Sequence, residues 1–211
     1  TLLVVGTGLK EQMKEFYPGL SVKTAPAFRF QGVYGTFLKH NPSKNISVLV
    51  ALYSILEEAV TTLNFVFETS VMCENDMSIK WNIKPHPLTD RHKLTGLTDH
   101  PFPDNWTWMD GDFHECLDKA DILIGSASST CVEAIARGRF VLLIGNQHGL
   151  THNPIPSTIP KDLWQLSYTY KDAAKAIKSY SNNNMQLITD NIRTDFFEPI
   201  TNDNVNNLVK L

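Results

Sequence analysis

The stretch from Ala120 to Gly145 reads ADILIGSASSTCVEAIARGRFVLLIG. An apolar run at 122–125 leads into a turn of small residues, then a helix-forming segment at 129–137, and a second apolar run at 140–144. Gly138 follows the predicted helix, where a left-handed residue commonly ends a helix. Short strands that are apolar on both faces and joined by a helix are typical of a parallel sheet covered on both sides.

The rest of the chain continues this alternation. The pattern predicts strands at 2–6, 21–24, 46–52, 79–83 and 106–109, and helices at 10–16, 54–68, 113–119 and 171–181. We therefore predict an α/β fold with three layers, α/β/α, around a mainly parallel sheet. Ligands bind such a sheet at the carboxyl ends of its strands, so the residues that directly follow each strand are the first candidates for chemistry.

Composition narrows the class of protein. The 211 residues are 42% hydrophobic, which suits one domain over 1–211, with a loop seam at 28–43 and a C-terminal helical segment at 171–211. A net charge of −3 argues against nucleic acid as a partner. Three widely spaced cysteines without a CxxC pair favour the cytoplasm, and we expect no metal and no cofactor. Because the chain starts inside a strand-like run, we expect a fragment whose N-terminal domain is missing.

The small-residue turn carries most of the hydroxyl groups of the predicted ligand edge. Ser126, Ser128, Ser129 and Thr130 surround the predicted start of a helix. Backbone N–H groups and the helix dipole there favour an anion such as a phosphate, and the hydroxyls add donors. Glu133, one turn into the helix, is positioned to accept from ribose hydroxyls. The alternative is an ordinary crossover in which the serines only cap the helix.

A second candidate follows the predicted strand at 79–83 and reads Lys84-Pro85-His86-Pro87. The two prolines restrict the backbone on either side of His86. An imidazole at this edge is able to donate to a phosphate and to help a nucleotide leave. Lys84 and Pro87 are then contact candidates, and the alternative is a loop histidine made rigid by prolines.

Weaker candidates occupy other strand ends and loops. Possible sugar or base contacts are Gly6, Arg29, Asn146 and His148. We expect His92, His100 and His114 at the surface, Asp110 or Asp112 as a helix cap, and Trp164 in a loop.

Two of these motifs resemble a known group of enzymes. The stretch 120–145 resembles a segment of the C-terminal Rossmann-like domain of GT-B glycosyltransferases, a serine-rich turn followed by a Glu-Ala pair, which binds the nucleotide phosphate of the donor. Lys84-Pro85-His86-Pro87 is similar to the His-Pro motif of bacterial sialyl-, polysialyl- and Kdo transferases, which acts with a Ser-Ser/Thr motif to hold CMP. CDP-glycerol glycerophosphotransferases of wall teichoic acid synthesis carry a similar pair. The resemblance covers about 79–146 well and the rest loosely.

The resemblance implies one half of a GT-B fold, with His86 catalytic and the two motifs on neighbouring strand ends. It implies a glycosyltransferase of bacterial surface polysaccharide synthesis, capsule or lipopolysaccharide, that transfers a sugar or glycerol phosphate from a CMP- or CDP-linked donor to a glycan acceptor. The resemblance also implies that the protein associates peripherally with the inner face of the membrane. Two alternatives stay open: an enzyme like a UDP-sugar 2-epimerase, and a non-catalytic binding module with a glycosyltransferase-like fold.

Overall fold

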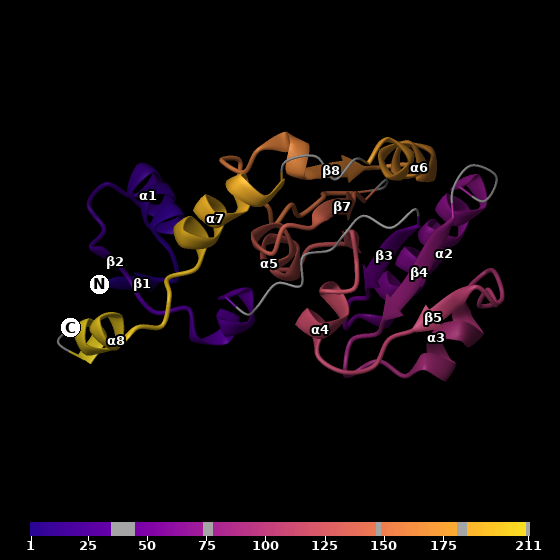
Figure 1. The fold of residues 1–211 in the computed structure, drawn as a ribbon, viewed down its shortest axis with the longest axis horizontal. Helices are drawn as coiled ribbons and strands as arrows, with labels where there is room; N and C mark the ends of the chain where they lie inside the picture. Colours follow the sequence, from indigo (N-terminus) through magenta and orange to yellow (C-terminus); the bar gives the residue numbers. More distant parts are fainter. Residues whose placement is uncertain (35–44, 74–77, 147–148, 181–184, 210–211) are drawn as a thin grey trace. The chain divides into compact units, whose positions relative to one another are not determined.

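The computed structural model describes residues 1–34, 45–73, 78–146, 149–180 and 185–209. Its contacts divide the chain into two compact units (Figure 1). The first comprises Thr1–Phe37, Ala136–Gly138 and Asn184–Leu211, and the second comprises Leu38–Ile135 and Arg139–Asn183. The single domain over 1–211 stays a prediction, because a division by compactness does not set the domain limits of a protein.

The second unit is built on a six-stranded sheet in which every pairing is parallel. Its strands are β3 (Ile46–Ala51), β4 (Ile79–Lys84), β5 (Trp106–Trp108), β6 (Ile122–Gly125), β7 (Phe140–Ile144) and β8 (Trp164–Ser167), in the order β5-β4-β3-β6-β7-β8. Helices flank the sheet in a three-layer α/β/α arrangement, which confirms the predicted fold class. They are α2 (Leu56–Cys73), α3 (Arg91–Leu97), α4 (Phe113–Leu117), α5 (Thr130–Ala136) and α6 (Tyr170–Ser179), with a 3-10 turn η2 (Lys161–Leu163).

Burial explains why these strands read as uninterrupted apolar runs. Val48, Val50, Ile122 and Ile124 are completely buried, and they join a core that includes residues of α2 and α6. Each buried aliphatic side chain of this size contributes about 1.5–3 kcal/mol relative to an exposed one. The face of the sheet that shares this core is therefore held by its own buried aliphatic side chains.

The strand order contains one reversal, between β3 and β6. From β3 the chain adds β4 and β5 outward on one side, and then β6, β7 and β8 outward on the other. The carboxyl ends of β3 and β6 therefore flank a topological switch point, the place where open α/β sheets bind their ligands. The order also corrects the expectation of neighbouring strand ends: β3 lies between β4 and β6, so these two strands are about 10 Å apart.

Asp121 has a structural role at the opposite, amino edge of the sheet. Its side chain accepts the backbone N–H of Ser47 at 2.8 Å, and its own N–H donates to the Ser47 carbonyl at 2.7 Å. Asp121 is 4% exposed. Asp121, directly before β6, thus joins β3 to β6 at the edge opposite the ligand edge.

Two elements of the second unit differ from the sequence prediction. Trp164, expected in a loop, begins β8 and is buried. The run Trp-Gln-Leu-Ser has no β-branched residue, so pairing with β7 rather than propensity makes it a strand. The unpredicted α3 contains Thr95 and Gly96, both poor helix formers, and is held by the Asp90 cap and by buried Leu94.

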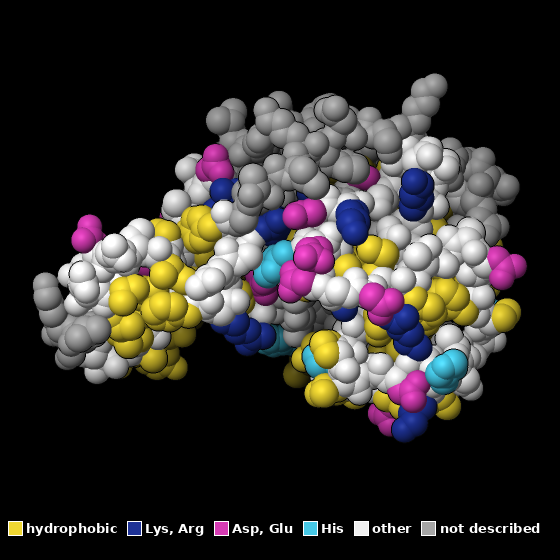
Figure 2. Space-filling view, turned by 60° about the horizontal axis from the view of Figure 1, so that its bottom comes forward, with side chains coloured by type: hydrophobic (Ala, Val, Ile, Leu, Met, Phe, Trp, Pro, Cys, Tyr) yellow, Lys and Arg dark blue, Asp and Glu magenta, His cyan; other side chains and the backbone are white. Residues whose placement is uncertain are grey.

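The first unit carries a separate two-stranded parallel sheet of β1 (Leu2–Val4) and β2 (Val22–Thr24). Its other elements are α1 (Thr7–Phe16), the 3-10 segment η1 (Phe28–Tyr34), α7 (Met185–Phe196) and α8 (Asn202–Val209). The predicted strands at 2–6 and 21–24 do not join the large sheet and pair with each other instead. Hydrophobic side chains gather on the surface of this unit (Figure 2), and Leu3, Phe16 and Tyr17 are exposed. Among the described helices of both units, none has the length and apolarity to span a bilayer.

Candidate functional site

The structure places most predicted site residues at the carboxyl edge of the six-stranded sheet. Lys84, His86 and Pro87 end or follow β4, and Asn146 follows β7. The hydroxyl turn, Ser126–Thr130, and Glu133 lie between the end of β6 and the first turns of α5. Gly6 and Arg29 belong to the first unit, and His148 lies outside the described residues.

Several hydrogen-bond donors of the hydroxyl turn are used in bonds within the turn itself. Thr130 Oγ1 donates to Ser128 Oγ at 2.9 Å, and the N–H groups of Cys131 and Val132 donate to the Ser128 and Ser129 carbonyls at 3.1 and 3.0 Å. The first amides of α5 are thus engaged within the turn. Because Ser128 Oγ accepts from Thr130, its own proton is directed elsewhere and suits an anion. The Ser128 hydroxyl is therefore more available to an anion than the amides of Cys131 and Val132 are.

Close packing behind the turn keeps its shape. A Cβ on Gly125 would lie 3.1 Å from Cys131 Sγ, and that thiol donates to the Ser126 carbonyl at 3.4 Å. Burial raises the pKa of Cys131 to about 12, so the group is a neutral thiol and not a nucleophile. Gly138 ends the helix at φ +73°, which confirms the predicted left-handed stop.

Glu133 is buried and contacts a histidine that the sequence placed at the surface. The His114 side chain is 19% exposed, and its Nε2 lies 3.0 Å from Glu133 Oε2. Ser129 Oγ donates to Glu133 Oε1 at 3.4 Å. The surface expectation for His114 is therefore wrong. Its position just after β5, beside the Asp112 cap, was the signal that marked it as part of the ligand edge.

His86 is held in a defined tautomer by the turn that follows it. Its Nδ1 accepts the backbone N–H of Leu88 at 3.2 Å, and its carbonyl accepts the N–H of Thr89 at 2.9 Å. A neutral ring with an acceptor at Nδ1 carries its proton on Nε2. His86 is thus prepared to donate from Nε2, which is what a phosphate oxygen requires.

A pocket of about 600 Å³ begins at the carboxyl ends of β6 and β7 and runs along α2. Ser126 and Asn146 line it, together with three carboxylates, Glu58, Glu68 and Asp99. Among its described lining residues there is no lysine or arginine. Its volume is within the range of small-molecule sites. Its described lining does not include His86, Ser128 or Thr130, so the pocket and the hydroxyl turn meet only at Ser126 and Ala127.

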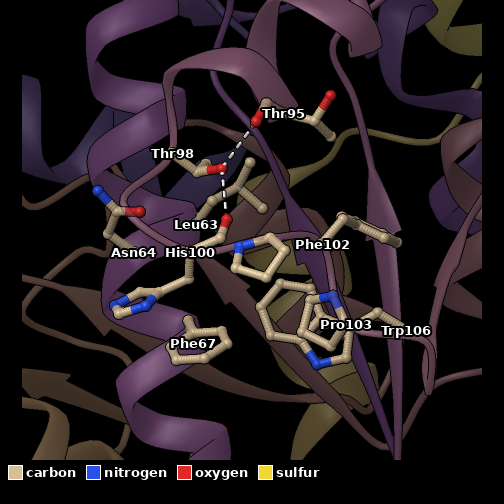
Figure 3. Close-up of a pocket in the computed structure, with 10 residues that line it drawn as sticks. Leu63, Asn64, Phe67, Thr95, Thr98, His100, Phe102, Pro103 and Trp106 are labelled. Atoms are coloured by element: carbon tan, nitrogen blue, oxygen red, sulfur yellow. Dashed lines mark hydrogen bonds between the residues drawn. The ribbon is translucent and has the colours of Figure 1, made fainter.

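A second, much smaller cavity of about 10 Å³ lies between α2, the end of α3 and β5 (Figure 3). The His100 ring stacks on Phe67 with centroids 3.9 Å apart, and its Nε2 lies 3.2 Å from Glu68. His100 is therefore partly covered by Phe67, although its side chain is still 36% exposed. Trp106 Nε1 is buried here without a hydrogen-bond partner among the described residues. A cavity of this size has room for about one water molecule, so it is a packing feature and not a substrate site.

The two candidates in the first unit have different surroundings. Gly6 is buried, and a Cβ on it would overlap the carbonyl of Asp195 and the backbone of Phe196, so its missing side chain serves packing. Arg29 is exposed, with its guanidinium carbon 5.6 Å from the Phe30 ring centroid. Across the described ranges, no group of three or more histidine, cysteine or acidic residues is arranged to hold a metal ion.

No protein family matches the chain by sequence. The curated proteins likewise contain no match. Solved structures do match in fold. A protein from Listeria monocytogenes described as a UDP-N-acetylglucosamine 2-epimerase superposes with a TM-score of 0.58 at 16% identity, covering 94% of this chain and 56% of that one.

Two further solved structures match in fold. A variant of the wall teichoic acid polymerase TagF, soaked with CDPG, has a TM-score of 0.52 at 13% identity, with 99% of this chain and 54% of that one covered. TarM has a TM-score of 0.51 at 14% identity, with 99% and 42% covered. The chain thus spans about half the length of these relatives in fold. It has the architecture of one half of a GT-B protein.

Proposed function

We propose that this chain is the donor-binding half of a glycosyltransferase that takes a cytidine nucleotide donor. The observation that carries the proposal is the position of the hydroxyl turn, Ser126–Thr130, directly after β6 at the topological switch point of a parallel sheet. His86 stands at the same edge with its donor nitrogen prepared by the Leu88 amide. Both features suit a phosphate-bearing ligand.

Each residue has a distinct part in this proposal. Ser128 holds a phosphate oxygen, Thr130 supports it by donating to Ser128 Oγ, and Glu133 meets the ribose. His86 donates a hydrogen bond to the phosphate that leaves with the nucleotide, and this stabilises the developing negative charge. The strands β4 and β6 are about 10 Å apart, with β3 between them, so the proposed ligand is held from two separate strand ends.

The large pocket favours one class of donor over another. Glu58, Glu68 and Asp99 line it without a lysine or arginine among its described residues. Two like charges 4–8 Å apart near a protein surface repel by about 2–4 kcal/mol at an effective dielectric constant of 20. We therefore favour a CDP-linked neutral polyol such as CDP-glycerol over a CMP-linked acidic sugar.

The test is a calorimetric titration of the chain with CDP. His86→Ala and Ser128→Ala are each expected to weaken CDP binding about tenfold or more, because hydrogen bonds to charged groups contribute about 1.5–3 kcal/mol. His92→Ala and Ser157→Ala change exposed residues of the same types and serve as matched controls. If both site variants bind CDP as tightly as the unchanged chain, the site assignment is wrong.

Competing nucleotides separate the alternatives. Tighter binding of UDP than of CDP would favour the epimerase-like enzyme, and no stabilisation by any nucleotide in a thermal shift screen would favour the non-catalytic module. Competition of CDP-glycerol against CMP-N-acetylneuraminate then tests the preference for an uncharged polyol over an acidic sugar.

The wider setting is part of the same proposal. The acceptor site and the catalytic base would come from a second domain of the same protein, which agrees with the half-length match to the solved structures. The acceptor would be a bacterial surface glycan, and the protein would act in the cytoplasm at the inner face of the membrane.

A further inference from the structure

Three side chains form a connected group between the segment after β5 and the start of α5. His114 Nε2 lies 3.0 Å from Glu133 Oε2, and Ser129 Oγ donates to Glu133 Oε1 at 3.4 Å. The Glu133 side chain is 8% exposed and that of His114 is 19% exposed. Both oxygens of a buried carboxylate therefore contact protein groups, and the two groups come from different elements.

The carboxylate needs these contacts for two reasons. A buried carboxylate without hydrogen bonds is strongly destabilising. A glutamate side chain also has several rotamers, and only a partner from outside its own helix selects one of them. Since Ser129 gives its proton to Glu133, the direction of that hydroxyl depends on where the carboxylate is held.

His114 is itself held in place from more than one side. The Asp112 carboxylate accepts the His114 backbone N–H at 2.7 Å and lies 3.5 Å from the ring Nδ1. The neighbouring Phe113 ring meets the imidazole edge to face, with centroids 5.4 Å apart. The imidazole is therefore a fixed group, and a suitable one to hold another side chain.

We propose that His114 is a positioning residue, which holds the Glu133 carboxylate and, through it, the Ser129 hydroxyl in the orientation that the ligand meets. His114 contacts no ligand itself. It connects the β5–α4 segment to the hydroxyl turn, which is three strands away in the sheet order. The effect on a ligand rests on the proposed function, because the ligand in question is the cytidine nucleotide.

The contact can be tested without any nucleotide. In the ¹⁵N-labelled full chain, long-range nitrogen–proton correlations report which ring nitrogen of each histidine carries a proton. His114 Nε2 is expected to be protonated, because a carboxylate oxygen lies 3.0 Å away. The spectrum of His114→Gln identifies the signal by its loss. An Nε2 of His114 without a proton would overturn the inference, whether or not CDP binds.

The consequence for binding is tested by CDP calorimetry on three variants. His114→Gln keeps an N–H at a similar reach and is expected to bind CDP within about threefold of the unchanged chain. His114→Leu removes the donor and is expected to weaken binding about tenfold, whereas His92→Leu, on exposed α3, is expected to have no effect. If His114→Leu does not fold, His114→Asn replaces it, with the same loss expected because its amide is too short.

A negative result for the role of His114 can be distinguished from a negative result for the proposed function. If His114→Leu binds CDP as well as the unchanged chain, the positioning role is wrong and the proposed function stands. If the unchanged chain binds no CDP, the proposed function is wrong, and the protonation of Nε2 then decides the His114–Glu133 contact on its own.

Discussion

Asp112 shows how one side chain prepares another for a role at the ligand edge. It caps α4 by accepting the His114 N–H, and it lies directly after β5. Burial acts to raise the pKa of its carboxyl, but the hydrogen bond from the His114 amide, the charge of His114 and the amides of Glu115 and Phe113 together lower it. Capping and charge therefore outweigh desolvation at this residue.

This lowered pKa predicts a pH dependence of stability. A carboxyl whose pKa is lower in the folded than in the unfolded state stabilises the protein fully above the unfolded value of 3.8, and that contribution is lost as the pH falls through the folded pKa. Asp112→Asn keeps a cap but does not titrate. We expect the difference in melting temperature between the unchanged chain and Asp112→Asn to be largest near pH 6 and to shrink below pH 4, as followed by circular dichroism. A difference that grows on acidification would contradict this.

Among the secondary-structure elements, two glycines differ in what their missing side chain does for a short helix: Gly138 follows α5, and Gly96 lies inside α3. Gly138 ends α5 at φ +73°, a conformation that costs about 1–2 kcal/mol for a residue with a side chain. Gly96 lies inside α3, and a Cβ on it would meet no atom within 4 Å. The same chemical change, glycine to alanine, therefore has a different sign at the two positions.

We predict that Gly138→Ala lowers the free energy of unfolding by about 1–2 kcal/mol, while Gly96→Ala raises it by about 0.5–1 kcal/mol. Urea denaturation of both variants measures the two effects on one scale. Destabilisation by Gly96→Ala equal to that by Gly138→Ala would show that backbone conformation is not the cause.

At the scale of the whole molecule, each compact unit has its own sheet. Among the described residues, the core cluster on the face of the sheet that includes α2 and α6 lies between Ile46 and Tyr180. The strands β1 and β2 pair with each other and with no strand of that sheet. A unit with its own core and its own complete set of strand pairings is expected to fold independently.

A fragment of residues 38–183 tests this expectation. We predict that it unfolds cooperatively in urea and that it binds CDP within about threefold of the full chain, because the hydroxyl turn and His86 lie within it. A fragment with a native-like circular dichroism spectrum in the far ultraviolet but no cooperative transition would contradict the prediction.

Local signals in the sequence were sufficient for much of the second unit. The apolar runs of β3, β6 and β7, the small-residue turn after β6 and the left-handed Gly138 depend on residues close together in the chain, and each was predicted. Strand β8 was missed because it has no β-branched residue, and the single strand-favouring Trp164 does not indicate a strand without the pairing to β7.

The three-layer α/β fold, the hydroxyl-rich turn and the histidine after a strand could be predicted from sequence, because strand periodicity and turn chemistry are local properties. The separation of the His86 strand from the turn by β3, and the contact of His114 with Glu133, became evident in the folded molecule. Strand order and contacts between distant side chains arise from packing the whole sheet, and no short window of sequence contains that information.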